Sequence, residues 1–361
     1  EGKKITASKL ARHPIGTGPY RFVEWQSGEK IVLEANRDYF EGSPYIKRFV
    51  FRIIPDTSTQ FLELQTGGLD FMSLSPLQYD RQTDTLAFKR LFNKYRYLAF
   101  GYTYLGYNLK RPMFQDRRVR QALAYAIDKQ EIIDGVLLGY GQAATGPYKP
   151  DAWVYNDKVP RYAYNPEKAR RLLAEAGWVD SDGDGILDKN GAPFQFTIVT
   201  NQGNDLRSKA GEIIQRRFRQ VGIDVQLRII EWATFLKEFI NPGNFDATIL
   251  GWSGGPEPDQ FEIWHSSKTG PRELNFISYK NPEVDMLLEK GRRIFDQSER
   301  KLIYDRFQQL LAEDQPYTFL FVGEALPAVA SRFHGIEPTA AGIRYNFNQW
   351  YVPQGLQKFS R

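Results

Sequence analysis

Strands and helices alternate along most of this chain, and that alternation is the feature that most constrains its fold. Residues 223, 225, 227 and 229 are apolar with a polar residue between each pair, which indicates a half-buried strand. A helical pattern runs over residues 206–221, directly before that strand. Strands that alternate with helices in this way build layered α/β structures. We therefore predict an α/β fold.

The first hundred residues are richer in strands. Segments 20–25 and 31–35 flank a turn with Gly28 and predict a hairpin. Residues 48–54 are mostly apolar and predict a buried strand, and Asp56 is expected to cap a helix that ends before Gly67. The rest of the chain predicts helices over 116–135, 166–176, 232–240, 282 onward and 298–315, and strands over 95–107, 194–200, 245–252, 316–322 and 328–333.

Composition narrows the function. A chain of 361 residues exceeds what one hydrophobic core usually serves, so two domains or lobes are expected. Cysteine is absent, which excludes disulfides, thiol nucleophiles and zinc–thiolate or iron–sulfur sites. Only three histidines are present, so proton-transfer chemistry has few candidates. We therefore expect a protein that binds a ligand, is not an enzyme and needs no cofactor.

The charge pattern argues against a nucleic-acid partner. The formal net charge is +5, but the basic clusters at 117–120 and 216–219 lie within predicted helices and have acidic neighbours. Such clusters are typical of solvated helix faces. No apolar stretch approaches the roughly 18 residues that span a bilayer. The chain begins without Met or an apolar signal core, so we expect that a signal or lipid anchor has been lost.

Residues 251–255 match the G-x-S-x-G pattern of serine hydrolases, with Ser253 as the nucleophile and Asp285 and His334 downstream. That motif requires a helix directly after the serine, because the helix amides support the oxyanion. Here two glycines and the prolines Pro256 and Pro258 follow, and they disfavour a helix. The pattern therefore favours a loop that lines a cleft, with a serine hydrolase as the rival interpretation.

Residues 180–188 resemble the first half of a calcium-binding loop. Asp180, Asp182, Asp184 and Asp188 offer carboxylate oxygens at alternate positions. The position of the bidentate Glu of an EF-hand is occupied by Gly191, and a strand follows in place of a helix. We interpret the segment as a solvated turn in a hairpin, with a weak structural Ca²⁺ site as the alternative.

Four tryptophans lie near loops or element ends: Trp153, Trp232, Trp252 and Trp264. Flat aromatic side chains at such places suit stacking on a ligand or sealing a cleft, although ordinary core packing explains any one of them equally well. Trp252 is the strongest candidate, because the glycines around it leave room for a ligand.

Several motifs together resemble the extracellular solute-binding proteins of family 5, the peptide-binding components of ABC importers. The resemblance rests on Gly16-Thr17-Gly18-Pro19-Tyr20, the run from Pro112 to Leu123, Tyr125-Ala126-Ile127-Asp128, Ala144-Thr145-Gly146-Pro147, Tyr164-Asn165-Pro166 and Gly177-Trp178. It implies a two-lobed, periplasmic-binding-protein-like fold (type II, cluster C-like) with the ligand cleft between the lobes. Family members normally have a longer segment before Gly16, so residues 1–106 would be a partial lobe I, 107–321 lobe II, and 322–361 the return to lobe I.

The resemblance also implies a function: capture of di- or oligopeptides by hinge closure and delivery to a membrane permease. The protein would be periplasmic or extracytoplasmic, associated with the membrane only through a lost signal, a lipid anchor or the permease. Because other family members bind sugars, nickel chelates or opines, a non-peptide solute is the alternative ligand. The candidate ligand contacts are Trp252, Ser253, Gly254, Gly255, Glu257, Asp259, Trp232, Asn201, Gln202 and Asn108.

One departure from the family concerns the ligand's amine. Peptide binders of the family usually carry an Asp soon after the Gly-Trp pair, and here Gly255 stands at that place. Either Glu257 or Asp259 replaces that carboxylate, or the ligand has no free amine, because a buried ammonium without a partner is costly. Arg207 is the candidate partner for a ligand carboxylate.

Overall fold

The computed structural model describes residues 8–358, and the chain divides into two compact units. Residues 1–97 and 325–361 form the first unit, and residues 98–324 form the second. Both contain strands and helices, so the α/β class is confirmed. The boundaries expected from the sequence, at 106/107 and 321/322, fall inside strands of the second unit's sheet and stay predictions.

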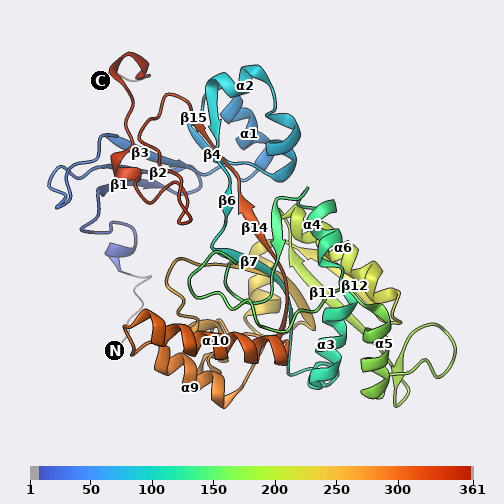
Figure 1. Cartoon of the computed structure of the whole chain (residues 1–361). Coiled ribbons are helices and arrows are strands. Elements are labelled where there is room, and N and C mark those ends of the chain that lie inside the picture. Colours follow the sequence, from blue (N-terminus) through green and yellow to red (C-terminus); the bar gives the residue numbers. More distant parts are fainter. Residues whose placement is uncertain (1–7, 359–361) are drawn as a thin grey trace. The chain divides into compact units, whose positions relative to one another are not determined.

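The second unit is built on a mixed sheet with the strand order β12-β11-β13-β7-β14-β6, and β8 also pairs with β14. The sheet is drawn in Figure 1. Strand β11 is parallel to β12 and β13, whereas β7 is antiparallel to β13 and β14. The strands are β6 (Tyr97–Leu98), β7 (Gly101–Tyr107), β8 (Gly141–Ala143), β11 (Gln195–Asn201), β12 (Asp224–Ile230), β13 (Ala247–Ser253) and β14 (Tyr317–Ala325).

Helices cover both faces of this sheet, because its strands alternate between two apolar clusters. On β7, Leu105 and Tyr107 pack in the cluster with α3, α5 and α6. Tyr102 and Tyr104 pack in the other, with α9 and α10. The helices are α3 (Arg117–Ala126), α4 (Lys129–Gly135), α5 (Pro166–Glu175), α6 (Asp205–Arg219), α9 (Pro282–Gly291) and α10 (Gln297–Asp314) (Figure 1).

Side-chain caps begin helices α5, α9 and α10 at or near the positions predicted from the sequence. Asn165 and Asn281 accept backbone N–H bonds at the first turns of α5 and α9, with proline at the next position. Asp296 caps α10, two residues before the predicted start, and Gln315 ends it in the left-handed conformation before Pro316. Residues 232–240 are helical as predicted, as α7 (Trp232–Thr234) and the π-helix η5 (Phe235–Ile240).

The first unit has two small antiparallel sheets. One has the order β1-β2-β3, from β1 (Tyr20–Gln26), β2 (Lys30–Ala35) and β3 (Arg48–Arg52), and contains the predicted hairpin. The other has the order β4-β15-β5, from β4 (Phe71–Ser73), β5 (Phe92–Lys94) and β15 (Pro327–Ala330). Helices α1 (Thr57–Gln65), capped by Asp56 as expected, and α2 (Leu86–Leu91) also belong to this unit.

Two predictions about elements were wrong. The helix expected over 116–135 is two helices, because Ile127 is extended and Asp128 caps α4 with its carboxylate. Strand β3 is mostly exposed where burial was expected. It is an edge strand, and of its side chains Phe49 is the one that packs on Tyr20 and Phe347.

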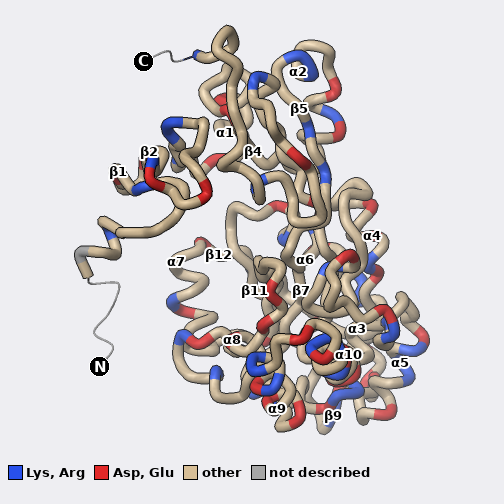
Figure 2. Tube along the Cα trace, turned by 60° about the vertical axis from the view of Figure 1, so that its left-hand side comes forward, with Lys and Arg blue, Asp and Glu red and all other residues tan. Residues whose placement is uncertain are grey.

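Charged side chains of both signs are interspersed along α5, α9 and α10 (Figure 2). The prediction that the basic clusters are solvated helix faces fits Arg216, which is 58% exposed and pairs with Glu131. It was wrong for Arg120, which is buried and donates to the carbonyls of Phe114 and Asp314. Within residues 8–358, no helix has the length and apolar character needed to cross a membrane.

Candidate functional site

Strands β11 and β13 run parallel, so their carboxyl ends lie at the same edge of the sheet. Beyond β11, the chain turns into α6, whose first turn carries Arg207. The last three residues of β13 open the glycine-rich segment predicted to line a cleft, residues 251–261, here called the 251–261 loop. Ligands of α/β proteins commonly bind outside the carboxyl ends of parallel strands. This edge of the second unit is therefore the candidate site.

Arg207 lies close to the start of that loop. A Cβ built on Gly251 would lie 3.1 Å from Nη2 of Arg207 and 3.0 Å from the Tyr102 carbonyl oxygen. Glycine at 251 therefore lets the guanidinium approach the strand end closely. Nη1 of Arg207 donates to Oδ1 of Asn201 at 2.7 Å, which joins two sequence-predicted residues.

The guanidinium of Arg207 lacks a carboxylate partner within the described part of the chain. It is half-buried and forms no ion pair with any residue in 8–358, and its Nε is buried without a hydrogen-bond partner there. Burial lowers the pKa of Arg207, and the neighbouring Tyr104 opposes that shift. An arginine keeps its charge at neutral pH even so. Arg207 is thus a positively charged group with unused donors at the strand edge.

Trp252 is held by an aromatic cluster at the same edge. Its Nε1 donates to Oη of Tyr317 at 3.4 Å, and its ring is nearly parallel to that of Tyr104, 6.3 Å away between centroids. Tyr104 and Tyr317 stack on each other at 3.8 Å, and both are fully buried. Burial raises the pKa of both phenols, so they stay neutral. The indole is half-buried, with a fixed orientation.

Beyond Ser253 the loop is fastened to helices and a neighbouring tyrosine. Glu257 accepts two hydrogen bonds from the Arg300 guanidinium, one of them at 3.2 Å from Nη1 to Oε2, and Asp259 pairs with Nε of Arg292 at 3.1 Å. The Pro258 carbonyl accepts from Oη of Tyr148 at 2.6 Å. The loop ends where α8 (Phe261–Trp264) begins. Its carboxylates therefore already have cationic partners.

The remaining predicted contacts are in different surroundings. Trp232, 48% exposed, stacks on Phe235 in the α7–η5 segment. Gln202 has an exposed side chain, and its backbone N–H bonds to the Ile230 carbonyl. The buried Asn108 amide donates to the carbonyls of Gly243 and Phe245, so its donors are used within the fold.

Sequence reasoning missed Tyr104, Tyr317, Arg292 and Arg300. The two tyrosines had a partial signal, because both lie in predicted strands rich in aromatic residues. The two arginines had none. They lie 33 and 43 residues after the loop residues with which they pair, and the packing of α9 and α10 on the loop brings them to it.

The serine-hydrolase motif does not assemble. Ser253 is exposed at the end of β13, and no helix starts there, as the prolines predicted, because α8 begins only at Phe261. Asp285 accepts from the backbone N–H and hydroxyl of Ser266 instead. His334 belongs to the first unit, where its ring packs on Tyr351. Among residues 8–358, no hydrogen bond joins Ser253 to Asp285 or to a histidine.

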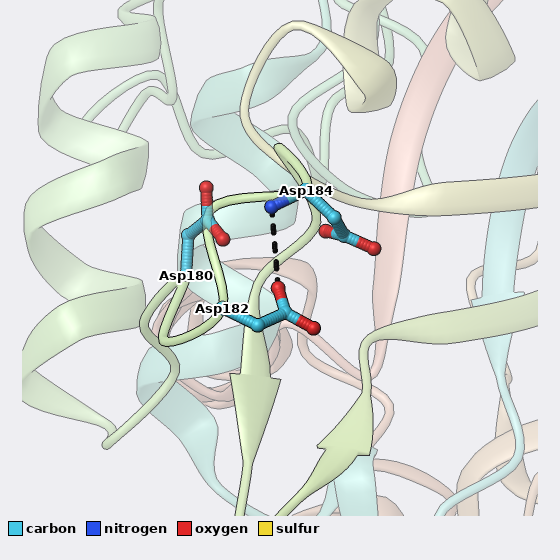
Figure 3. Close-up of side chains that lie close together, drawn as sticks. All are labelled: Asp180, Asp182 and Asp184. Carbon is cyan, nitrogen blue, oxygen red and sulfur yellow. Dashed lines mark hydrogen bonds between the residues drawn. The ribbon is translucent and has the colours of Figure 1, made fainter.

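The acidic residues at 180–188 form a separate feature on the surface of the second unit. Oxygens of Asp180, Asp182 and Asp184 lie within 4.8 Å of one another, and all three side chains are exposed (Figure 3). Asp180 accepts from the N–H groups of Gly183 and Gly185, and Asp182 accepts from that of Asp184. Asp188 accepts from Ser181 at the foot of a short hairpin, β9 (Asp188–Lys189) with β10 (Ala192–Pro193). Carboxylate oxygens suit Ca²⁺, and a structural calcium here stays a prediction.

Comparison with known proteins supports the two-lobed fold and shows the family to which the chain belongs. Residues 1–272 match the model of bacterial extracellular solute-binding proteins, family 5 Middle. The oligopeptide-binding protein AppA of Bacillus subtilis is 39% identical over 345 residues, 94% of this chain and 62% of the relative. The chain thus spans about three fifths of that relative's length.

Solved structures agree. The structure of that AppA in complex with a nonapeptide superposes with a TM-score of 0.81, over 94% of this chain and 67% of the other, at 39% identity. NikZ from Campylobacter jejuni, in complex with Ni(L-His), superposes with a TM-score of 0.84, over 96% of this chain and 70% of the other, at 28% identity.

Proposed function

The chain belongs to the bacterial extracellular solute-binding proteins of family 5, and from that premise we propose that it captures peptides for an ABC importer. In this proposal it works outside the cytoplasmic membrane and hands its ligand to permease subunits. It binds without catalysis: Ser253 lacks the helix and the histidine that a serine nucleophile needs.

The observation that carries the proposal is Arg207, a half-buried guanidinium without an ion pair among residues 8–358, beside a fixed indole. A peptide's terminal carboxylate supplies the missing charge and accepts from Nη–H groups of the guanidinium. Trp252 then packs on the neighbouring peptide unit or side chain. The N–H of Gly254 already bonds to the Phe100 carbonyl, so main-chain hydrogen bonds with an extended ligand would use other backbone groups of this edge.

A nickel chelate is a second candidate, favoured by the similarity to NikZ. The carboxylate of a nickel-bound amino acid would use Arg207 in the same way. The two candidates differ in the rest of the ligand, because a chelate is small and carries a metal, whereas an oligopeptide extends along the site.

Native mass spectrometry of the protein as purified tests the proposal. We expect adducts in a series of peptide masses that disappear after mild unfolding and return when a library of random nonapeptides is added. A single adduct with the isotope pattern of nickel would favour the second candidate. Failure to retain any member of the library, by a protein whose melting is cooperative, would contradict peptide capture.

A further inference from the structure

The charges around the site are unbalanced, and the imbalance bears on which end of a ligand is recognised. Resting on the proposed function, we propose that this site recognises an anionic end of its ligand and leaves the ligand's amine without a carboxylate partner. Peptides with a blocked or distant N-terminus are then bound as well as peptides with a free one.

Glu257 is committed to Arg300. Both carboxylate oxygens accept from the guanidinium, whose side chain is only 16% exposed, and this pairing raises the pKa of Arg300. If Glu257 turned toward a ligand ammonium, it would leave a largely buried cation unpaired. Glu257 is 63% exposed, so a new pair with an ammonium would return no more than the pair with Arg300 that it replaces.

Asp259 is committed as well. One oxygen forms an ion pair with Nε of Arg292, and the other accepts from the backbone N–H of Phe261 at 3.0 Å, the residue that opens α8. The Arg292 guanidinium also lies over the Phe261 ring, 4.4 Å from its centroid. The carboxylate therefore holds the end of the loop and the start of α8 together.

Other carboxylates near the site already bond to backbone N–H groups, pair with a lysine or are exposed to water. Glu231 accepts from the N–H groups of Ala233 and Thr234 at the start of α7, and these bonds lower its pKa. Glu262 pairs with Lys268. Asp205, in the first turn of α6, is exposed to water, where a charge pair contributes little.

Arg207 is the opposite case. Arg207 forms no ion pair with a carboxylate of residues 8–358, and its guanidinium lies close to Gly251, the residue that precedes Trp252. The loop acids are paired with Arg292 and Arg300, so the half-buried charge of Arg207 remains without a carboxylate partner among residues 8–358. Such a site attracts an anionic group and disfavours an ammonium, and this mismatch is a source of specificity.

Four random nonapeptide libraries test the inference: free at both ends, N-acetylated, C-amidated, and blocked at both ends. The retained peptide per protein is measured by native mass spectrometry. We expect acetylation to change retention by less than about threefold, the scale of an exposed charge pair. We expect amidation to lower it at least about tenfold, the scale of a partly buried one. The inference is overturned if acetylation causes the larger loss, or if the two losses are equal.

Glu257→Gln and Asp259→Asn give the matched variants, each checked for an intact fold by thermal melting. Both are expected to retain the same ratio of free to acetylated peptide as the unchanged protein. A variant that loses its preference for free-ended over acetylated peptides would identify its carboxylate as the amine's partner and sink the inference. No retention from any of the four libraries contradicts peptide capture itself, a result distinct from sensitivity to acetylation.

Discussion

Two glycine-rich loops of the second unit imitate known motifs, and they differ in how their polar atoms are used. The 180–188 loop satisfies its carboxylates locally, with its own backbone N–H groups, and all of its three clustered acids are exposed. The 251–261 loop satisfies its carboxylates over long range, with arginines from α10 and the end of α9. The first is a self-contained turn, and the second is fastened to the body of the unit.

This difference indicates which groups of each loop remain available to bind a ligand. A loop whose acids are already paired offers few charged groups to a ligand, so specificity falls to the atoms left over. At the 251–261 loop these are the Arg207 donors and the Trp252 ring, which the loop and the aromatic cluster hold in place. At the 180–188 loop they are exposed oxygen lone pairs, which only a cation would use.

Arg207→Met should have the largest effect on the 251–261 side of the comparison. The change removes the charge and keeps much of the side-chain volume, so a ligand carboxylate would be left without a partner. We expect affinity for free-ended nonapeptides to fall by about 2–4 kcal/mol, measured by calorimetry. Arg306→Met, which removes a half-exposed partner of Glu283, is the control and should bind normally. Equal binding by both variants would remove Arg207 from the site.

Trp252→Ala should have the next largest effect. Loss of the indole removes a ring held by Tyr317 and by the stack on Tyr104. We expect a loss of about 1–3 kcal/mol in the same titration. Trp252→Phe keeps a flat ring and should recover most of the affinity. Unchanged affinity in Trp252→Ala would show that this edge of the sheet does not contact the ligand.

Loss of the ion pair between Glu257 and Arg300 should lower the stability of the protein more than its affinity for peptides. Arg300→Met leaves Glu257 without its partner, and Glu257→Gln leaves Arg300 with a weaker one. Because Glu257 is 63% exposed, we expect each change to lower the free energy of unfolding by only about 0.5–1 kcal/mol. A double-mutant cycle by thermal melting isolates the pair's coupling. A coupling near zero would mean that the loop is held by its other contacts.

The sequence was informative wherever local chemistry decides the structure. Asparagine–proline caps predicted α5 and α9, and strict alternation predicted β12, because both depend on neighbours in the chain. The break at Ile127 escaped prediction, since a capping Asp128 inside a helical pattern is also compatible with a continuous helix.

At the site, the sequence indicated Trp252 and Arg207 but not what surrounds them. The commitment of Glu257 and Asp259 depends on which arginines the packing of α9 and α10 brings to the loop, and no spacing encodes that. The same holds for Asn108, whose polar side chain looks free in the sequence and bonds to backbone carbonyls in the fold.

The smallest effect is expected at the 180–188 loop. Oxygens of Asp180, Asp182 and Asp184 lie within 4.8 Å of one another, but these three carboxylates are all exposed to water. Extracellular calcium sites of that kind bind in the roughly millimolar range, so a few millimolar calcium should stabilise the protein by at most about 1 kcal/mol. Asp180→Asn should abolish that gain in a thermal melt, and magnesium should not reproduce it. A calcium shift that survives Asp180→Asn arises elsewhere, and no shift at all leaves the loop as a solvated turn whose carboxylates serve only its own backbone.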